Sequence, residues 1–283
     1  MVKFGPSGND ILFYDEGHKH SSEAFEWVKN RGLDLYEYSL ARNVYLKEET
    51  ALQFYELSKK YGIEISVHAP YYINLANESE EAIEKNIAYI IRSLQLLKIM
   101  GGKKCVVHLA SQGTKERNEA LRITKNNLLK VLEKIYEYKL DDLFLCPETM
   151  GKYVQIGNHE EIINFCKLDK CLIPTFDFGH LNCLMQGKLN NEEEYEKIIK
   201  LCNQELGEFK TNNMHIHFSK IEFSSKGEIR HLTLDDTKFG PPFEPLAKVL
   251  KNYKIENATI ISESREIMAQ DALRLKKMFY KQS

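Results

Sequence analysis

Short apolar runs rich in β-branched and aromatic residues alternate along the chain with longer segments of helical periodicity. Eight such runs occur, at residues 2–5, 33–39, 63–69, 103–110, 143–149, 171–178, 213–219 and 258–264. Because a strand followed by a helix is the repeating unit of a parallel sheet, the alternation predicts eight successive βα units. The segment 79–100 shows the helical pattern clearly, with one apolar stripe formed by Ile83, Ile87, Ile90, Ile91, Leu94 and Leu97.

The number of units favours a closed barrel. Eight units without a break in composition or a Pro/Ser-rich linker fit a (β/α)8 TIM barrel better than an open doubly wound sheet. No GxGxxG fingerprint follows the first run, as a dinucleotide-binding sheet would require. Because α/β barrels reach this length with a single core, we predict an α/β fold with one TIM-barrel domain over residues 1–283.

Cysteine use and hydropathy indicate the compartment. The six cysteines are scattered without a CxxC pair, and most lie in apolar runs, which is typical of reduced, buried thiols in a cytosolic protein. The initial MVKFGPSG lacks the apolar core of a signal peptide, and no stretch approaches the roughly 18 apolar residues of a membrane span. We therefore expect a cytoplasmic protein that does not enter a membrane. We also expect it to be a monomer.

The formal net charge of −2 gives no basic balance that would indicate a nucleic-acid partner. Three of the acidic residues are candidate metal ligands, however, and bound divalent ions would make their surroundings positive. The net charge therefore neither supports nor excludes DNA binding.

Histidines and carboxylates stand at the ends of the apolar runs, which is the strongest chemical pattern in the chain. Imidazole and carboxylate suit Zn²⁺, Mn²⁺ or Fe²⁺. In a barrel, these positions fall at the C-terminal ends of strands three to eight, where such folds gather their active sites. Since one four-coordinate ion cannot use them all, we predict more than one metal. The candidates are His68, His108, Glu148, Asp177, His180, His215 and Glu263, with His231 apart in a polar segment.

Some of these residues could instead have a structural role. Asp177 would serve equally well as the N-cap of the next helix, with His180 on that helix's surface. Glu148 would be stable in a salt bridge to a neighbouring Lys or Arg. His215 and His217 share one face of their strand, because side chains alternate with period two, so either could reach a metal. Proximity to the strand's C-terminal end favours His217.

Six fragments in fixed order resemble the endonuclease IV group of abasic-site endonucleases, which are zinc-dependent barrels. They are VHAPYYINLAN, VVHLASQG, PETMG, FDFGHLNCLMQG, HIHFSK and the terminal SES. Each fragment is weak alone, but together they span nearly the whole chain. The resemblance implies cleavage of double-stranded DNA on the 5′ side of abasic sites during base-excision repair.

The resemblance also implies two or three zinc ions per chain, with Mn²⁺ or Fe²⁺ as possible substitutes. The first zinc would be held by His68 and His108, with Glu148 bridging it to a second zinc. The second site would be completed by Asp177, His215 and Glu263, where His215 is selected by aligning the dipeptide Ser219–Lys220 with the family. A third zinc would be held by His180 and His231.

The third site departs from the family pattern. Where the family has an aspartate two residues before the last histidine, this chain has Ile229. Glu228 is adjacent, but an offset of one residue on an extended segment points a side chain to the opposite side.

Further roles follow from the resemblance. Glu148 and Glu263 are the predicted catalytic carboxylates. Residues in the loops and strands near the barrel mouth would contact the duplex and its phosphates: Arg42, Asn43, Tyr71, Tyr72, Lys220 and Arg230.

Two other functional classes remain open. Glu148, Asp177, His215 and Glu263 alone resemble the single-metal site of sugar isomerases and epimerases, in which two glutamates exchange protons with the sugar. A barrel that binds nucleic acid without catalysis is the third class. The number of ions per chain separates the first two, because one ion favours the epimerase and two or three favour phosphoester cleavage.

Overall fold

Eight parallel strands form a ring in the computed structural model, which describes residues 1–40, 44 and 46–281. They pair as two four-stranded halves in the orders β2-β3-β4-β6 and β1-β12-β9-β8. The barrel strands are β1 (Lys3–Pro6), β2 (Leu35–Ser39), β3 (Glu64–His68), β4 (Lys104–Val107), β6 (Phe144–Pro147), β8 (Thr175–Asp177), β9 (His215–Phe218) and β12 (Thr259–Ser262). Each of the eight predicted runs overlaps one of these strands, and seven of them contain it entirely.

Backbone bridges join the two halves at both seams. Ser7, directly after β1, pairs with Glu37 in the middle of β2, and Glu148, directly after β6, pairs with Thr175 at the start of β8. At the first seam, a Cβ on Gly5 would lie 1.8 Å from the carbonyl oxygen of Leu35, so only glycine permits this approach. The ring is therefore closed, and the predicted (β/α)8 barrel is confirmed.

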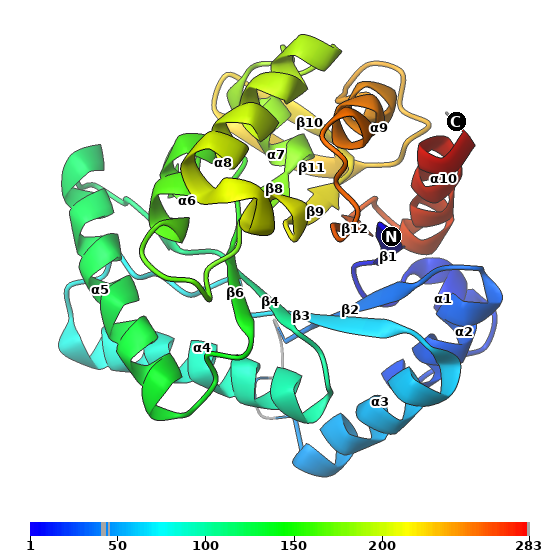
Figure 1. The fold of residues 1–283 in the computed structure, drawn as a ribbon, viewed down its shortest axis with the longest axis horizontal. Coiled ribbons are helices and arrows are strands. Elements are labelled where there is room, and N and C mark those ends of the chain that lie inside the picture. Colours follow the sequence, from blue (N-terminus) through cyan, green and yellow to red (C-terminus); the bar gives the residue numbers. More distant parts are fainter. Residues whose placement is uncertain (41–43, 45, 282–283) are drawn as a thin grey trace.

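Helices surround the ring of strands, as Figure 1 shows. They are α1 (Ile11–Asp15), η1 (Ser21–Glu23), α2 (Ala24–Asn30), α3 (Glu48–Tyr61), α4 (Glu80–Ile99), α5 (Arg117–Glu137), α6 (His159–Cys166), α7 (Phe178–Leu184), α8 (Glu192–Asn212), α9 (Phe243–Asn252) and α10 (Met268–Lys281). The predicted stripe of α4 faces inward, with Ile83, Ile90 and Leu94 buried. None of the helices in the described residues is long and apolar enough to cross a membrane.

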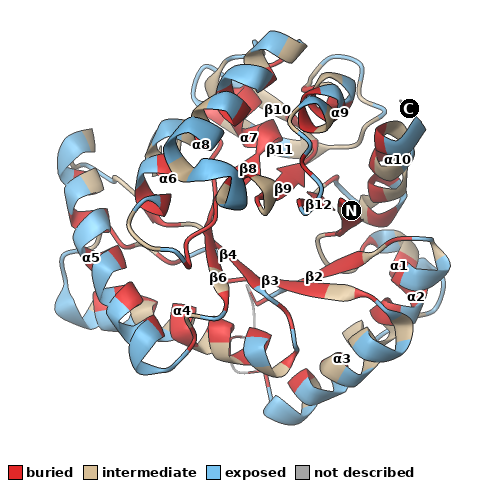
Figure 2. Cartoon of the chain, viewed as in Figure 1, coloured by how far each residue is buried: buried red, intermediate tan, exposed pale blue. Residues whose placement is uncertain are grey.

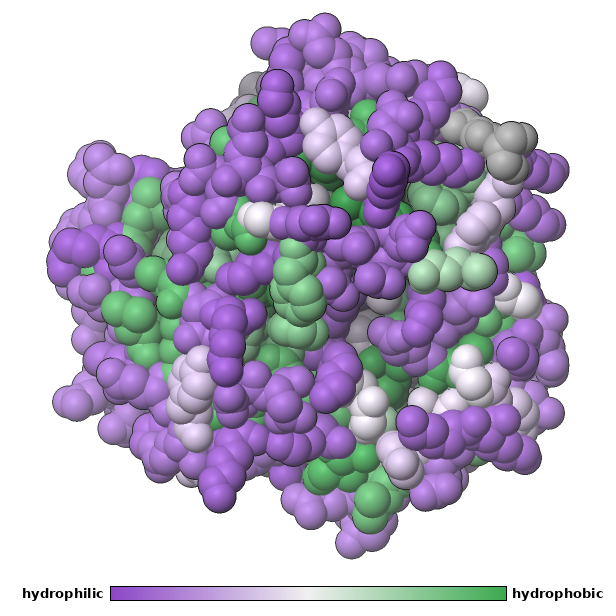
Figure 3. Space-filling view, viewed as in Figure 1, coloured by the Kyte–Doolittle hydropathy of each residue, from purple (hydrophilic) through white to green (hydrophobic). Residues whose placement is uncertain are grey.

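Burial follows the pattern expected of a parallel sheet covered on both faces. Every residue of β4, β9 and β12 is buried, and the helices expose only their outer sides (Figure 2). The face shown in Figure 3 is mostly hydrophilic, with hydrophobic residues in small groups between polar ones. The strands therefore present a rigid rim on which side chains at their C-terminal ends are held in place.

Two small antiparallel ribbons extend beyond the ring. One pairs β5 (Ala110–Ser111) with β7 (Gln155–Ile156), and the other is the hairpin of β10 (Lys220–Ser224) and β11 (Gly227–Leu232). The tip of this hairpin contacts the segment after β6, because Glu228 N donates to Gly151 O at 2.8 Å. Gly227 has a φ of 101° and lies so close to Gly151 O that a Cβ would be 2.3 Å from it.

Candidate metal centre

Most of the predicted ligands lie at the carboxyl ends of barrel strands. His68 is the last residue of β3, Asp177 is the last residue of β8, and His108, Glu148 and Glu263 directly follow β4, β6 and β12. Because the strands are parallel, these ends meet at one rim. With four further residues, they form three adjoining groups that could each hold an ion, and a fourth such group, Glu37, His215 and His217, is fully buried inside the barrel.

The first group consists of His68, His108 and Glu148. Glu148 Oε2 lies 3.2 Å from His68 Nε2 and 2.9 Å from His108 Nε2. His68 Nδ1 lies 2.7 Å from the carbonyl oxygen of Ala69, so Nδ1 carries a proton. A neutral His68 therefore points a lone pair at a carboxylate oxygen, and that arrangement needs a proton or a cation between the two atoms.

The second group consists of Glu148, Asp177, His217 and Glu263. His217 Nδ1 lies 3.0 Å from Glu148 Oε1 and 3.4 Å from Glu263 Oε1. Asp177 divides its oxygens between two roles, because Oδ1 accepts the backbone N–H of His180 at 2.7 Å and caps α7. Its Oδ2 is buried, lies 3.5 Å from His180 Nδ1 and accepts no hydrogen bond from a described residue. A buried carboxylate oxygen without a donor is costly, and a divalent cation would satisfy it.

The third group consists of His180, Glu228 and His231. His180 Nε2 lies 3.5 Å from Glu228 Oε2, and His231 Nε2 lies 3.7 Å from Glu228 Oε1. The other ring nitrogens are already engaged, since His180 Nδ1 is 2.9 Å from Thr149 O and His231 Nδ1 is 2.9 Å from Ser219 Oγ. Both rings therefore turn their Nε2 atoms toward one carboxylate, as ligands of a shared ion would.

Glu228 places a carboxylate beside these two histidines, and the prediction that its side chain points to the opposite side was wrong. The pairing of β10 with β11 shifts from Glu222–Arg230 to Phe223–Glu228, so Ile229 is an extra residue in β11. Such a bulge turns the preceding side chain onto the other face. Ile229 is consequently 53% exposed, while Glu228 joins His231 at the site.

His217 takes the place that the family alignment gave to His215. His215 Nε2 lies 2.9 Å from Glu37 Oε2 and its Nδ1 lies 2.6 Å from Thr259 Oγ1, so the ring is engaged deeper in the barrel. Although the two ring centroids lie only 5.0 Å apart, His215 faces Glu37 and Thr259, whereas His217 Nδ1 faces Glu148 and Glu263. The alternative based on position near the strand end, which pointed to His217, agrees with this placement.

Burial and the charges of neighbouring ligand residues shift the pKa values of the ligand side chains. Burial opposes charging of His68 and His180, but neighbouring carboxylates outweigh it and raise the pKa of each to about 9. Burial raises the pKa of Asp177 to about 6. Burial would also raise the pKa of Glu148, but the charges on His217 and His108 hold it well below its usual range. Protons can thus take the positions between ligands, and a bound divalent ion would displace them.

The groups border a cleft of ≈ 340 Å³. Sequence reasoning missed several of its lining residues because none of them is a type of side chain that indicates metal binding at the end of an apolar run: Ser7, Ser39, Met150, Lys152 and Gln155. Ser7 Oγ donates to Glu263 Oε1 at 3.3 Å, which orients that carboxylate. The cleft thus combines buried ligands with polar groups that a substrate can reach.

The predicted DNA-contacting residues fall in different places. Tyr71 lines the cleft and is 65% exposed, and Tyr72 packs edge-on against it. Lys220 donates to the backbone oxygen of Asp236 and lines a different hollow, while Arg230 Nε donates to Glu222 Oε2 at 2.7 Å. Arg42 and Asn43 lie outside the described residues.

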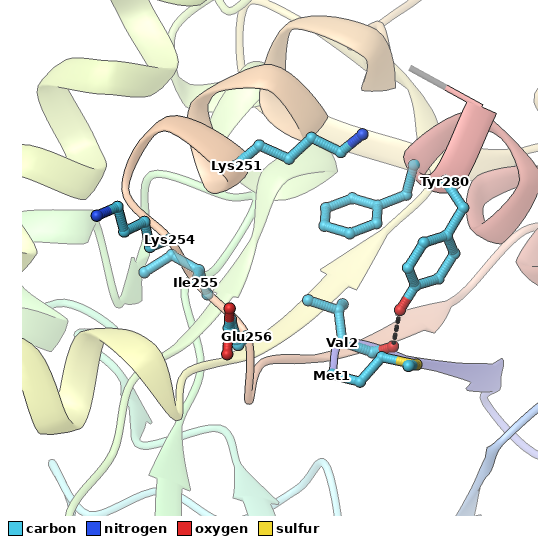
Figure 4. Close-up of a pocket in the computed structure, with 8 residues that line it drawn as sticks. Met1, Val2, Lys251, Lys254, Ile255, Glu256 and Tyr280 are labelled. Atoms are coloured by element: carbon cyan, nitrogen blue, oxygen red, sulfur yellow. Dashed lines mark hydrogen bonds between the residues drawn. The ribbon is translucent and has the colours of Figure 1, made fainter. Parts of the chain in front are cut away.

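A larger hollow of ≈ 430 Å³ lies at the opposite end of the barrel, around the start of β1. Figure 4 shows that it is bordered by Met1, Val2 and Tyr280, whose hydroxyl donates to Val2 O, and by Lys251 and Lys254. It contains none of the three ligand groups. The cleft at the carboxyl ends of the strands is therefore the candidate site despite its smaller volume.

Comparisons with known proteins agree with this architecture. Residues 25–278 match the model of the xylose isomerase-like TIM barrel family, so the chain belongs to that family. An uncharacterized protein of Methanocaldococcus jannaschii is 31% identical over 281 residues, which are 99% of this chain and 97% of that protein. A probable endonuclease 4 of Mycoplasmopsis synoviae is 31% identical over 229 residues, which are 77% of this chain and 75% of that protein. The resemblance to endonuclease IV is thereby confirmed.

Solved structures share the fold. Endonuclease IV from Thermus thermophilus superposes with a TM-score of 0.72 at 19% identity, covering 93% of this chain and 94% of that one. A D-tagatose 3-epimerase-like protein gives a TM-score of 0.70 at 20% identity, covering 88% of both chains. At such identities the likeness shows the barrel alone, and the two similar scores do not separate the two chemistries.

Proposed function

We propose that this protein is a metal-dependent phosphodiesterase of the endonuclease IV type, which cleaves DNA on the 5′ side of abasic sites. The observation that carries the proposal is the set of three adjoining ligand groups along one cleft. They use nine side chains, more than a single ion can take, and two of the groups share Glu148. Relatives named probable endonuclease 4 support the same function.

Each group would hold one zinc ion, with Mn²⁺ or Fe²⁺ as possible substitutes. The ligands would be His68, His108 and Glu148 for the first ion, Glu148, Asp177, His217 and Glu263 for the second, and His180, Glu228 and His231 for the third. The chemistry that close divalent ions supply in such sites is activation of a water molecule and neutralisation of charge on the departing oxygen.

The protein's own groups then position the substrate. Glu148 presents one oxygen to the first group and the other to the second, so it fixes the spacing of the two. Glu263 is 17% exposed in its side chain and is held by Ser7, so its carboxylate is available to orient a reacting water. At the cleft border, the ring of Tyr71 would stack on an exposed base, and the ammonium of Lys152 would contact a phosphate.

A sugar epimerase is the second candidate. Glu148, Asp177, His217 and Glu263 form a quartet of one histidine and three carboxylates, which resembles the single-metal epimerase site. This function leaves His68, His108, His180, Glu228 and His231 without a task at the same cleft. Such a surplus of converging ligands favours phosphodiester cleavage.

The deciding experiment uses an end-labelled duplex with one abasic site, with and without chelator, beside a panel of ketoses. We expect a single nick on the 5′ side of the lesion that leaves a 3′-hydroxyl, is lost with chelator and returns with zinc. An undamaged duplex of the same sequence is the control. Ketose turnover without nicking, together with one bound ion per chain, would replace this proposal with the epimerase.

A further inference from the structure

A fully buried carboxylate, Glu37, lies beneath the ligand groups inside the barrel. It stands on β2, and its oxygens face residues of β3 and β9. Oε2 accepts from Ser66 Oγ at 2.8 Å and lies 2.9 Å from His215 Nε2. Oε1 lies 3.1 Å from Nε2 of His217. Both atoms are buried, and neither makes a hydrogen bond of standard geometry with any described residue, each other included, so this 3.1 Å ion-pair contact is what links each of them to a partner.

His217 therefore has two distinct sides. Its Nδ1 faces Glu148 and Glu263, while its Nε2 faces Glu37. A neutral imidazole carries one proton, so Nδ1 can offer a lone pair to an ion only if Nε2 holds that proton. A carboxylate at Nε2 enforces this tautomer and makes Nδ1 a stronger ligand.

A chain of hydrogen bonds connects Glu37 with residues deeper in the barrel and determines which groups its two oxygens accept from. A charged lysine can only donate hydrogen bonds, and Lys104 Nζ donates one to Thr259 Oγ1 at 2.8 Å. Thr259 can then donate its own proton to His215 Nδ1, which is 2.6 Å away. His215 must in turn carry its proton on Nε2 and donate it to Glu37 Oε2. With Ser66 also donating to Oε2, Oε1 is left to accept from His217.

We propose that Glu37 is a positioning residue for the metal centre, and that a directional hydrogen-bond chain from Lys104 through Thr259 and His215 sets its role. The chain fixes the tautomer of His217, so that Nδ1 serves as a ligand of the second ion. The inference rests on the metal centre of the proposed function, but it does not depend on whether the substrate is DNA or a sugar.

The first test is metal binding by Glu37→Gln, which keeps the shape of the side chain and removes its charge. We expect one ion per chain to bind about 10- to 100-fold more weakly in competition with a chromophoric chelator, while the remaining ions bind as in the wild type. Asp271→Asn is the matched control, because Asp271 is equally buried and accepts from Leu234 N and Arg274 Nη1 away from the cleft. Wild-type affinity at every site in Glu37→Gln would overturn the proposal.

The second test reads the tautomer directly in the zinc-loaded wild-type protein, and a variant is used only to assign the signals. Ring ¹⁵N chemical shifts of His217, assigned by their loss in His217→Asn, should show a protonated Nε2 and an unprotonated Nδ1. A protonated Nδ1 would overturn the proposal. Thr259→Val, which interrupts the chain three contacts away from His217, should weaken the same ion by less than Glu37→Gln does.

The outcomes also separate this inference from the proposed function. If the wild type binds no divalent ion, both fail. If the wild type binds two or three ions and Glu37→Gln binds them equally well, only the role of Glu37 fails. Selective loss of one ion together with the expected tautomer supports the inference, whichever substrate is turned over.

Discussion

The first two ligand groups and the third are built in different ways. The first two stand on the rim of the barrel, where His68, Glu148 and Asp177 end or follow strands that are paired on both sides. The third is assembled from α7 and the hairpin β10–β11, and its carboxylate depends on a bulge at Ile229. Ligands on the rim are set by the fold itself, whereas those on the hairpin are set by local irregularity. We therefore expect the rim to be essential and the hairpin to adjust the activity.

The largest effect should follow from changing the residue that the rim groups share. Glu148→Gln removes the charge that links the first two groups, and we expect nicking of an abasic-site duplex to fall at least about 10³-fold. Metal content measured on the dialysed protein should fall with it. A Glu148→Gln protein that retains full activity would contradict the bridging role and the distinction between rim and hairpin.

A smaller, selective effect should follow on the hairpin. Glu228→Gln should weaken one ion by at least about 10- to 100-fold and leave the rim ions in place, as measured by competitive metal titration. Adding Ile229→Asp to this variant should not restore the ion, because the bulge turns position 229 toward solvent. If the double variant binds the ion again, the pairing of β10 with β11 can shift and bring position 229 to the site, which would contradict this prediction.

The protons that replace metal ions should give a pH effect on stability. His68 and His180 have folded pKa values of about 9, above the ordinary value of 6.5, so their contribution is full below pH 6.5 and is lost as the pH rises through 9. Between these limits, the Tm of the metal-free protein should fall by about 2 °C or more. With zinc bound, Tm should not fall over this range, since metal binding favours neutral imidazoles. Differential scanning calorimetry with and without chelator tests this, and an unchanged Tm in the metal-free protein would contradict it.

The smallest expected effect concerns the substrate rather than the ions. Lys152→Ala should weaken binding of an abasic-site duplex several-fold and lower the salt dependence of binding by about one phosphate contact. Arg230→Ala should change both less, because Arg230 is paired with Glu222 on the hairpin. Fluorescence anisotropy at several salt concentrations measures the affinity and its salt dependence. A larger effect of Arg230→Ala than of Lys152→Ala would contradict the prediction and indicate that the duplex lies over the hairpin.

The barrel was predictable from the sequence because each strand is a short, largely apolar run and each long helix carries one stripe. Most ligands could be named because a histidine or carboxylate at the end of such a run is costly to bury without a partner, and a metal ion supplies one. The choice between His215 and His217 and the orientation of Glu228 both depended on strand register, which the sequence does not give. A fixed offset from Ser219–Lys220 selected His215, but the end of β9 presents His217. Glu37 was not found because a single carboxylate within a strand gives no signal until its neighbours are known.

The bulge at Ile229 also makes the site tolerant of changes in chain length. An added residue in β11 is taken up where the strand meets solvent, so a carboxylate one position earlier can replace the usual one at the same point in space. Homologous barrels can therefore gain or lose a residue in this hairpin and keep a complete ligand set. A search that demands a fixed gap before the final histidine would miss them, whereas one that allows a glutamate three residues upstream would find them.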